Sequence, residues 1–184
     1  MRKAAIILAL LSLVTPLAGA SDNGAAAIVG LWKTEPNPNG CAIVEIGRDG
    51  STFNGRIVWL EKPVYGPDEP RPGQPKVDLN NPNPELRNRP IMGLEILKGF
   101  VYKGHGRWKE GTIYDPNVGK TYKCKMWLVG HDTLKVRGFI GFSFLGRNAV
   151  WHRVGHLPQQ PKARVEPAAS SASQPHASSP TPTR

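Results

Sequence analysis

Alternating hydrophobic and polar residues along most of the chain predict β-strands joined by short turns. In the clearest segment, one set of alternate residues is mainly apolar and the other mainly polar: Tyr122, Cys124, Met126 and Leu128 against Thr121, Lys123, Lys125 and Trp127. Successive side chains of a strand point to opposite faces, so the lysines mark a solvent face. Similar patterns predict strands near 28–34, 42–46, 51–60, 94–102, 108–114, 133–140 and 146–154.

Short turns between these segments predict how the strands are connected. Gly47-Arg48-Asp49-Gly50 is typical of a hairpin turn, and 20 glycines and 18 prolines argue against a helical bundle. We therefore predict an all-β fold, a single antiparallel up-and-down barrel of about eight strands within residues 28–154. Gly146–Val154 is expected to pair with Gly30-Leu31-Trp32, because pairing the first and last strands removes the sheet edges.

The expected interior of the barrel follows from the same alternation. Phe53, Gly55, Ile57 and Trp59 share one face of their strand, and we interpret that face as the interior. On the last strand, Trp151 is likewise expected to pack inside.

A long irregular segment, residues 61–92, interrupts the strands. Its eight prolines remove backbone donors that a sheet would need, and a loop of this length inside a compact domain is typical of a functional lid. Asn83-Pro84-Glu85 predicts a helical turn, with a capping asparagine and proline at the first helical position. Leu86 and Ile91 are expected to pack onto the barrel.

The two ends of the chain differ from the body. Residues 1–20 have a basic start, an apolar run and the small residues Ala18 and Ala20, which predict a signal peptide cleaved after Ala20 and a periplasmic or secreted protein. The apolar run is too short to favour a membrane anchor. Residues 155–184 are rich in proline, alanine and serine and predict a disordered tail.

The net charge of +10 does not by itself indicate nucleic-acid binding. With the leader (Arg2, Lys3) and the tail (net +2) set aside, the body carries +6, distributed as single lysines and arginines on strands. Such a surplus is typical of a solvated face, and no nucleic-acid partner is expected.

Cys41 and Cys124 are the two cysteines of the chain. In an oxidising compartment a two-cysteine protein favours a disulfide, and the alternative is two buried free thiols. No histidine stands at ligand spacing from either cysteine, so no metal site is expected.

Two segments look like catalytic motifs but lack residues that those motifs require. Gly119-Lys120-Thr121 lacks the upstream glycine of a phosphate-binding loop, and Gly141-Phe142-Ser143-Phe144-Leu145 lacks the second glycine of a nucleophile elbow. No catalytic residue and no cofactor is expected.

Aromatic and charged residues from several strands and the long loop are the candidate ligand-binding set: Trp59, Asn80, Arg87, Arg89, Tyr114, Asp115, Arg137 and Trp151. Core packing is the competing interpretation for Trp59 and Trp151, and a turn cap is the competing one for Asp115. Arg87 and Arg89 are favoured, because a proline-stiffened loop holding two arginines would offer forked donors to a carboxylate or phosphate.

Several segments together resemble a known family: Gly30-Leu31-Trp32-Lys33-Thr34, Gly55-Arg56-Ile57-Val58-Trp59-Leu60, Asn81-Pro82 through Arg89-Pro90, Gly111-Thr112-Ile113-Tyr114-Asp115-Pro116, Leu134-Lys135-Val136-Arg137-Gly138 and Trp151-His152-Arg153. In this order they are similar to an exported bacterial family, domain of unknown function 2147. The resemblance implies a small lipocalin-like, calycin-type barrel in which Trp32 is the floor and Arg153 its cover. It implies no established activity.

Two functions of different classes follow from these expectations. One is a non-catalytic binding module for a small, partly apolar or anionic ligand held beneath the lid. The alternative is an envelope or cell-wall interaction protein with a filled barrel and a basic, aromatic-bearing surface. An enzyme is third, because the sequence offers no acid–base pair and no nucleophile–base spacing.

Overall fold

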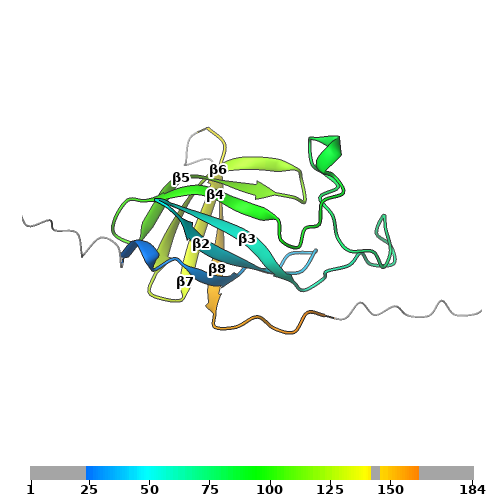
Figure 1. The fold of residues 1–184 in the computed structure, drawn as a ribbon, viewed down its shortest axis with the longest axis horizontal. Helices are drawn as coiled ribbons and strands as arrows, with labels where there is room; N and C mark the ends of the chain where they lie inside the picture. Colours follow the sequence, from blue (N-terminus) through cyan, green and yellow to red (C-terminus); the bar gives the residue numbers. More distant parts are fainter. Residues whose placement is uncertain (1–23, 142–145, 162–184) are drawn as a thin grey trace, which may run out of the picture.

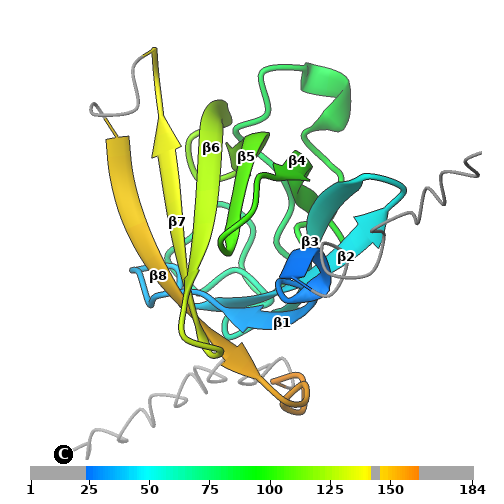
Figure 2. The same ribbon diagram turned by 90° about the vertical axis from the view of Figure 1, so that its left-hand side faces the viewer.

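In the computed structural model, which describes residues 24–141 and 146–161, eight strands form one closed antiparallel barrel. The strands are β1 (Gly30–Lys33), β2 (Ala42–Asp49), β3 (Thr52–Leu60), β4 (Glu95–Tyr102), β5 (Arg107–Asp115), β6 (Lys120–Val129), β7 (Thr133–Phe139) and β8 (Gly146–Val154). They follow one another in sequence order around the ring (Figure 2). The predicted up-and-down barrel of about eight strands is confirmed.

The barrel closes where β1 meets β8. Trp32 lies opposite Arg153 in this antiparallel pair, and Lys33 lies opposite His152. The pairing of the first and last strands leaves the sheet without an open edge, as the sequence predicted.

One end of the barrel, which we call the base, is filled by large side chains. The base holds fully buried aromatic and aliphatic residues from the N-terminal turn and most strands: Ile28, Trp32, Ile46, Phe53, Leu97, Phe100, Trp108, Met126 and Leu134. A helical turn at residues 24–26 lies at this end, and the long connection between β3 and β4 lies at the other (Figure 1). The base therefore supplies the tightly packed core of the molecule.

Arg153 seals the base from outside. Its guanidinium carbon lies 4.2 Å from the centre of the Trp32 ring, the arrangement that the family resemblance implies. Its nitrogens also donate to the carbonyl oxygens of Val29, Ala27 and His131 at 2.9, 2.6 and 3.0 Å. Gly30 adopts a φ of 133°, and a Cβ there would lie 2.9 Å from an Arg153 nitrogen. The glycine therefore allows both the backbone conformation and the close approach of the arginine.

A β-bulge turns Trp59 away from the interior. Ile43 on β2 pairs with Trp59 and Val44 pairs with Ile57, so Val58 is an extra residue on β3. One extra residue reverses the alternation, and Trp59 packs with Cys41 and Ile43 in a cluster separate from the interior core. The prediction that Trp59 faces the interior is corrected for this reason.

The segment that follows β8 covers this outer cluster. The Trp59 indole nitrogen donates to the Gln159 carbonyl at 3.3 Å, and the Gln160 side chain donates to the Leu60 carbonyl at 3.0 Å. Trp59 is 7% exposed as a result. The predicted disordered tail therefore begins with a held segment, 155–161; its remainder, 162–184, and the predicted signal peptide, 1–20, lie outside the described residues.

The two cysteines are free and buried, so the disulfide prediction is wrong and its alternative holds. Cys41 belongs to the outer cluster, whereas Cys124 belongs to the interior core. Burial raises the pKa of both thiols, that of Cys124 to about 12, which keeps them protonated near neutral pH.

Within residues 24–141 and 146–161, no helix has the length and apolar character needed to cross a bilayer.

Candidate ligand-binding site

The half of the barrel opposite the base is hollow and opens to solvent through a cavity of about 1360 Å³. Its walls are mainly branched aliphatic side chains from successive strands, including Ile57, Ile96, Ile113 and Val136. Trp151 is the lining residue of β8 farthest from the opening, next to the packed base. Alternation along the strands explains this lining, because every second residue of each strand points inward.

The rim of the cavity is polar and its charges balance. Three carboxylates and three cationic side chains line it: Glu35, Glu69, Asp115, Lys62, Lys76 and Arg147. Lys76 and Glu69 pair at 3.3 Å. The lining therefore combines an apolar interior with a rim of no net formal charge.

The long loop (residues 61–94) forms one side of the rim and is held by backbone hydrogen bonds. Lys76 donates to the Pro63 carbonyl at 2.9 Å, Ile91 donates to the Lys76 carbonyl at 3.0 Å, and Gly93 donates to the Ile57 carbonyl at 2.8 Å. These bonds explain how a segment with eight prolines is ordered: its remaining donors bond within the loop and to β3.

The predicted helical turn is present in this loop as a short 3-10 helix, η1 (Pro84–Leu86). The Asn83 side chain accepts a hydrogen bond from the Glu85 backbone at 3.0 Å, as the capping pattern predicted. Ile91 is buried against the barrel core, whereas Leu86 is 39% exposed. The prediction that both pack onto the barrel is thus correct for Ile91 and corrected for Leu86, because η1 buries none of its residues.

A buried carboxylate joins the loop to the barrel wall. Asp78 is fully buried and accepts from the Tyr114 hydroxyl at 2.7 Å, the Asn81 side chain at 2.8 Å and the Arg89 guanidinium at 2.9 Å. Such a charge is tolerated in the interior only when it is paired and hydrogen-bonded. Burial, followed by the hydrogen bond to Asp78, raises the pKa of Tyr114.

Sequence reasoning missed Asp78 and Asn81. The available signal was an acid between Val77 and Leu79, two apolar residues, in a segment that also contains Arg89. An acidic side chain flanked by apolar neighbours in this way is a candidate for a buried ion pair. Its partner on β5, Tyr114, lies 36 positions along the chain and was not deducible from spacing.

The long loop also contacts two turns at the rim, the turn between β5 and β6 and, through it, the turn between β1 and β2. The Asn80 side chain donates to the Asn117 carbonyl at 2.9 Å, and the Asn39 side chain donates to the Asn117 side-chain oxygen at 2.7 Å. Gly119, with a φ of 65°, leaves room for the loop, because a Cβ there would lie 1.7 Å from the Asn80 carbonyl oxygen. Three connections of the barrel thus meet at this point of the rim.

The predicted site residues divide into three groups. Asn80, Tyr114, Asp115 and Trp151 line the cavity together. Arg87 and Arg89 do not line it: Arg87 donates to the Asn81 carbonyl at 2.9 Å, and Arg89 bonds Asp78 while its guanidinium carbon lies 5.6 Å from the centre of the Tyr114 ring. Both arginines hold the loop, and neither lines the cavity.

Trp59 and Arg137 lie outside the cavity, which corrects their assignment to it. Trp59 faces outward because of the bulge at Val58. Arg137 follows the buried Val136 on β7, so alternation directs it to the outer face of the barrel, where it donates to the Asn148 side chain at 2.6 Å.

Asp78, the one fully buried acid of the described residues, already accepts from three side chains. Among the same residues, no three His, Cys, Asp or Glu side chains group as ligands for a metal ion.

Comparisons with known proteins agree with the barrel fold. The model of a family described as "Uncharacterized protein conserved in bacteria (DUF2147)" matches residues 30–153. A solved structure, protein HP1028 from Helicobacter pylori, described as belonging to the lipocalin family, superposes with a TM-score of 0.59. It is 23% identical to this chain, and the match covers 68% of this chain and 82% of that one. No match was found among curated proteins.

Proposed function

The chain belongs to the bacterial family DUF2147 and has a lipocalin-like barrel, and from this premise we propose that it binds a small, largely apolar molecule in the open half of the barrel. The observation that carries the proposal is the cavity of about 1360 Å³ with aliphatic walls and a polar rim. Ligand pockets have this composition, an apolar interior with a few polar groups that fix orientation.

The charges of the rim indicate which chemical group of the ligand would lie there. With three carboxylates and three cationic side chains, it supplies no net charge to select an anion. We infer that the ligand's apolar part reaches Trp151 and that a polar, uncharged end meets Asn80 and Asp115. An anionic ligand, held by Lys62, Lys76 or Arg147, is the alternative that a test must separate.

We place this binding outside the cytoplasm. The support is the leader-like sequence of residues 1–20, with Arg2 and Lys3 before an apolar run and small residues at its end. In the periplasm or beyond, a closed barrel with an open cavity would carry or sequester an apolar compound.

Two fluorescent probes with closely related aromatic skeletons test the proposal. Phenylnaphthylamine is uncharged, and anilinonaphthalene sulfonate carries one negative charge. We expect the full chain to bind the uncharged probe with blue-shifted emission and at least as tightly as the sulfonate. Ala149→Phe, which fills the cavity from β8, should weaken binding about tenfold or more, since it occupies ligand space.

Val150→Phe is the matched control. Val150 is the next residue on the same strand and lies opposite Lys135 on the outer face, so its enlargement leaves the cavity unchanged. Equal loss of binding in both variants would place the probe outside the barrel and refute the proposal. Binding of the sulfonate alone would instead favour the anionic ligand.

A further inference from the structure

The outer face of strands β5 to β7 carries cations that the barrel cavity does not use. Six arginines and lysines occupy outward positions on these three strands: Arg107, Lys109, Lys123, Lys125, Lys135 and Arg137. We call this set the basic face. No aspartate or glutamate occurs in β6, β7 or β8. These neighbouring strands therefore carry a local excess of positive charge.

The spacing of these cations follows from sheet geometry. Arg107 pairs with Trp127 and Trp127 with Lys135, which forms one row across three strands. Lys125 pairs with Arg137, which pairs with Asn148, in the next row. Neighbouring strands lie about 4.8 Å apart and alternate residues about 6.7 Å apart, so the basic face is a two-dimensional array of charges.

The glutamates of β4 and β5 pair with lysines outside the basic face. Glu110 pairs with Lys103 at 2.6 Å, and Glu95 lies 3.8 Å from Lys98. Within the described part of the chain, no carboxylate forms an ion pair with Arg107, Lys109, Lys123 or Lys135. Cations held close together on one surface favour an anionic partner.

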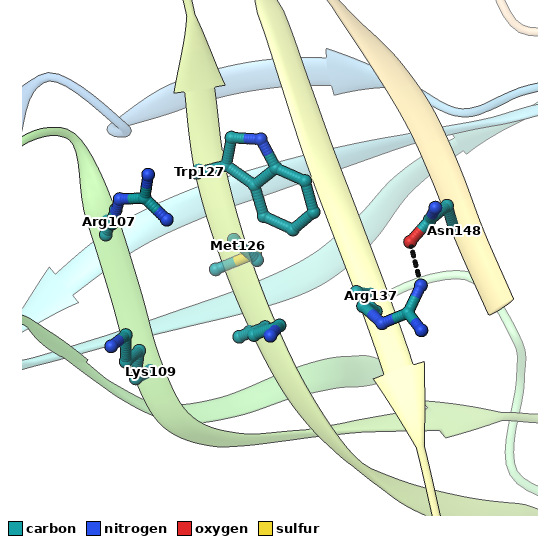
Figure 3. Close-up of a pocket in the computed structure, with 7 residues that line it drawn as sticks. Arg107, Lys109, Met126, Trp127, Arg137 and Asn148 are labelled. Carbon is teal, nitrogen blue, oxygen red and sulfur yellow. Dashed lines mark hydrogen bonds between the residues drawn. The ribbon is translucent and has the colours of Figure 1, made fainter. Parts of the chain in front are cut away.

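A groove of about 490 Å³ lies on the basic face, and an aromatic ring is among the side chains that line it. Figure 3 shows the Trp127 ring lying over the sheet, with Arg107 and Lys109 on one side and Arg137 and Asn148 on the other. Of the described residues that line the groove, only Trp127 is aromatic. A flat ring flanked by cations can pack against the apolar face of a sugar ring while acidic substituents reach the arginines and lysines.

We propose that the basic face binds an anionic glycan chain, that is, a sugar polymer bearing carboxylate or phosphate groups, with Trp127 as the stacking platform. A single aromatic ring does not favour single-stranded nucleic acid, because successive bases stack on several rings. A convex barrel wall with one large apolar side chain in the groove does not favour insertion into a lipid surface. The proposal concerns a surface outside the cavity and does not depend on the ligand proposed for it.

Binding to defined polymers tests this inference with the full chain. The probe is polygalacturonate, measured by calorimetry at low and at physiological salt. We expect affinity to fall with salt, because exposed charges are screened. Neutral dextran should bind far more weakly, since it lacks carboxylates, and polyglutamate should also bind more weakly, since it lacks sugar rings.

Charge-matched variants locate the binding site. Arg107→Gln with Lys109→Gln should weaken polygalacturonate binding about tenfold, because two exposed charge contacts are lost. The control pair, Arg48→Gln with Lys33→Gln, removes the same residue types from exposed positions on β2 and β1. It should change affinity less than about twofold. Trp127→Leu should weaken polygalacturonate binding about fivefold or more and leave binding of polyglutamate unchanged.

Three outcomes would overturn the proposal. Equal weakening by both charge pairs would show a response to net charge alone. Tighter binding of polyglutamate, oligothymidylate or phosphatidylglycerol vesicles than of polygalacturonate would assign the basic face to another partner. Loss of polygalacturonate binding in Ala149→Phe, the cavity-filling variant, would place the sugar inside the barrel.

Discussion

Trp151 joins the packed and the hollow parts of the barrel at one position. Its side chain is 4% exposed, belongs to the interior core and lines the cavity. The two interpretations of this tryptophan, core packing and ligand contact, are therefore not exclusive. The residue supports the cavity wall by being part of the core.

The stability contribution of Trp151 is testable by truncation. Trp151→Ala should lower the free energy of unfolding by about 3 to 5 kcal/mol, because a large buried ring is removed. Trp127→Ala, the same change at a partly buried position on the outer face, should cost less, about 1 to 2 kcal/mol. Urea unfolding at neutral pH measures both; similar losses would contradict the placement of the two rings.

Cys124 predicts a loss of stability at alkaline pH. Burial raises the pKa of its thiol from 9.0 to about 12, so the folded state holds a proton that the unfolded state releases first. The stability that the protonated thiol contributes is fully present below pH 9.0 and is lost as pH rises towards about 12. At a pH about 1.5 units above the unfolded pKa the loss amounts to about 2 kcal/mol.

The matched variant for this prediction is Cys124→Ala, which removes the titrating group. Its free energy of unfolding should fall less steeply between pH 9 and 11 than that of the unmodified chain, although Tyr114, with its raised pKa, titrates in both. Parallel slopes in urea titrations would show that Cys124 does not hold its proton in the folded state.

At the scale of elements, period-two alternation predicted the strands and the barrel because it is a local property of the sequence. It failed at Trp59, because one extra residue at Val58 reverses the faces and no sequence signal marks that residue. The buried network of Asp78 was missed for another reason. Its partner Tyr114 is distant in the chain, and such pairing is set by tertiary structure.

The loop and the turn between β5 and β6 form a contact that a single methyl group would break. Gly119→Ala would place a Cβ 1.7 Å from the Asn80 carbonyl, so the loop must move. We expect faster amide exchange at residues 76–92. Gly130→Ala is the control, with a φ of 66° against 65° at Gly119 and no atom within 4 Å of the added Cβ. Both variants carry the same backbone strain, so equal exchange in the loop would refute the contact.

The segment 155–161 acts as a strap over the outer cluster. A chain ending at Val154 should expose Trp59, shift its fluorescence to longer wavelength and lose about 1 to 2 kcal/mol of stability, because the apolar ring is returned to water. A chain ending at Pro161 keeps the strap and should match the full chain. If the two truncated chains have the same fluorescence, the strap does not cover Trp59 in solution.

At the scale of the whole molecule, stability comes from one half of the barrel and space for a ligand from the other. The base is closed by Trp32 and Arg153, whereas the opposite half is open between aliphatic walls. A filled interior would favour a structural protein, and a hollow interior would favour a binding protein. Both kinds of interior occur here, at opposite ends of one barrel. A packed base can hold the walls of the open half apart without a ligand.

This division predicts how a cavity ligand changes unfolding of the entire chain. A ligand that binds only the folded state stabilises it by about 2.7 kcal/mol at a hundred times its Kd. Phenylnaphthylamine at that concentration should therefore raise Tm by several degrees, and the transition should stay single, because every strand pairs with two neighbours in the closed barrel. Ala149→Phe should remove the shift while Val150→Phe retains it. A probe that lowers Tm in all three proteins would be binding unfolded chains, and the cavity would then not be its site.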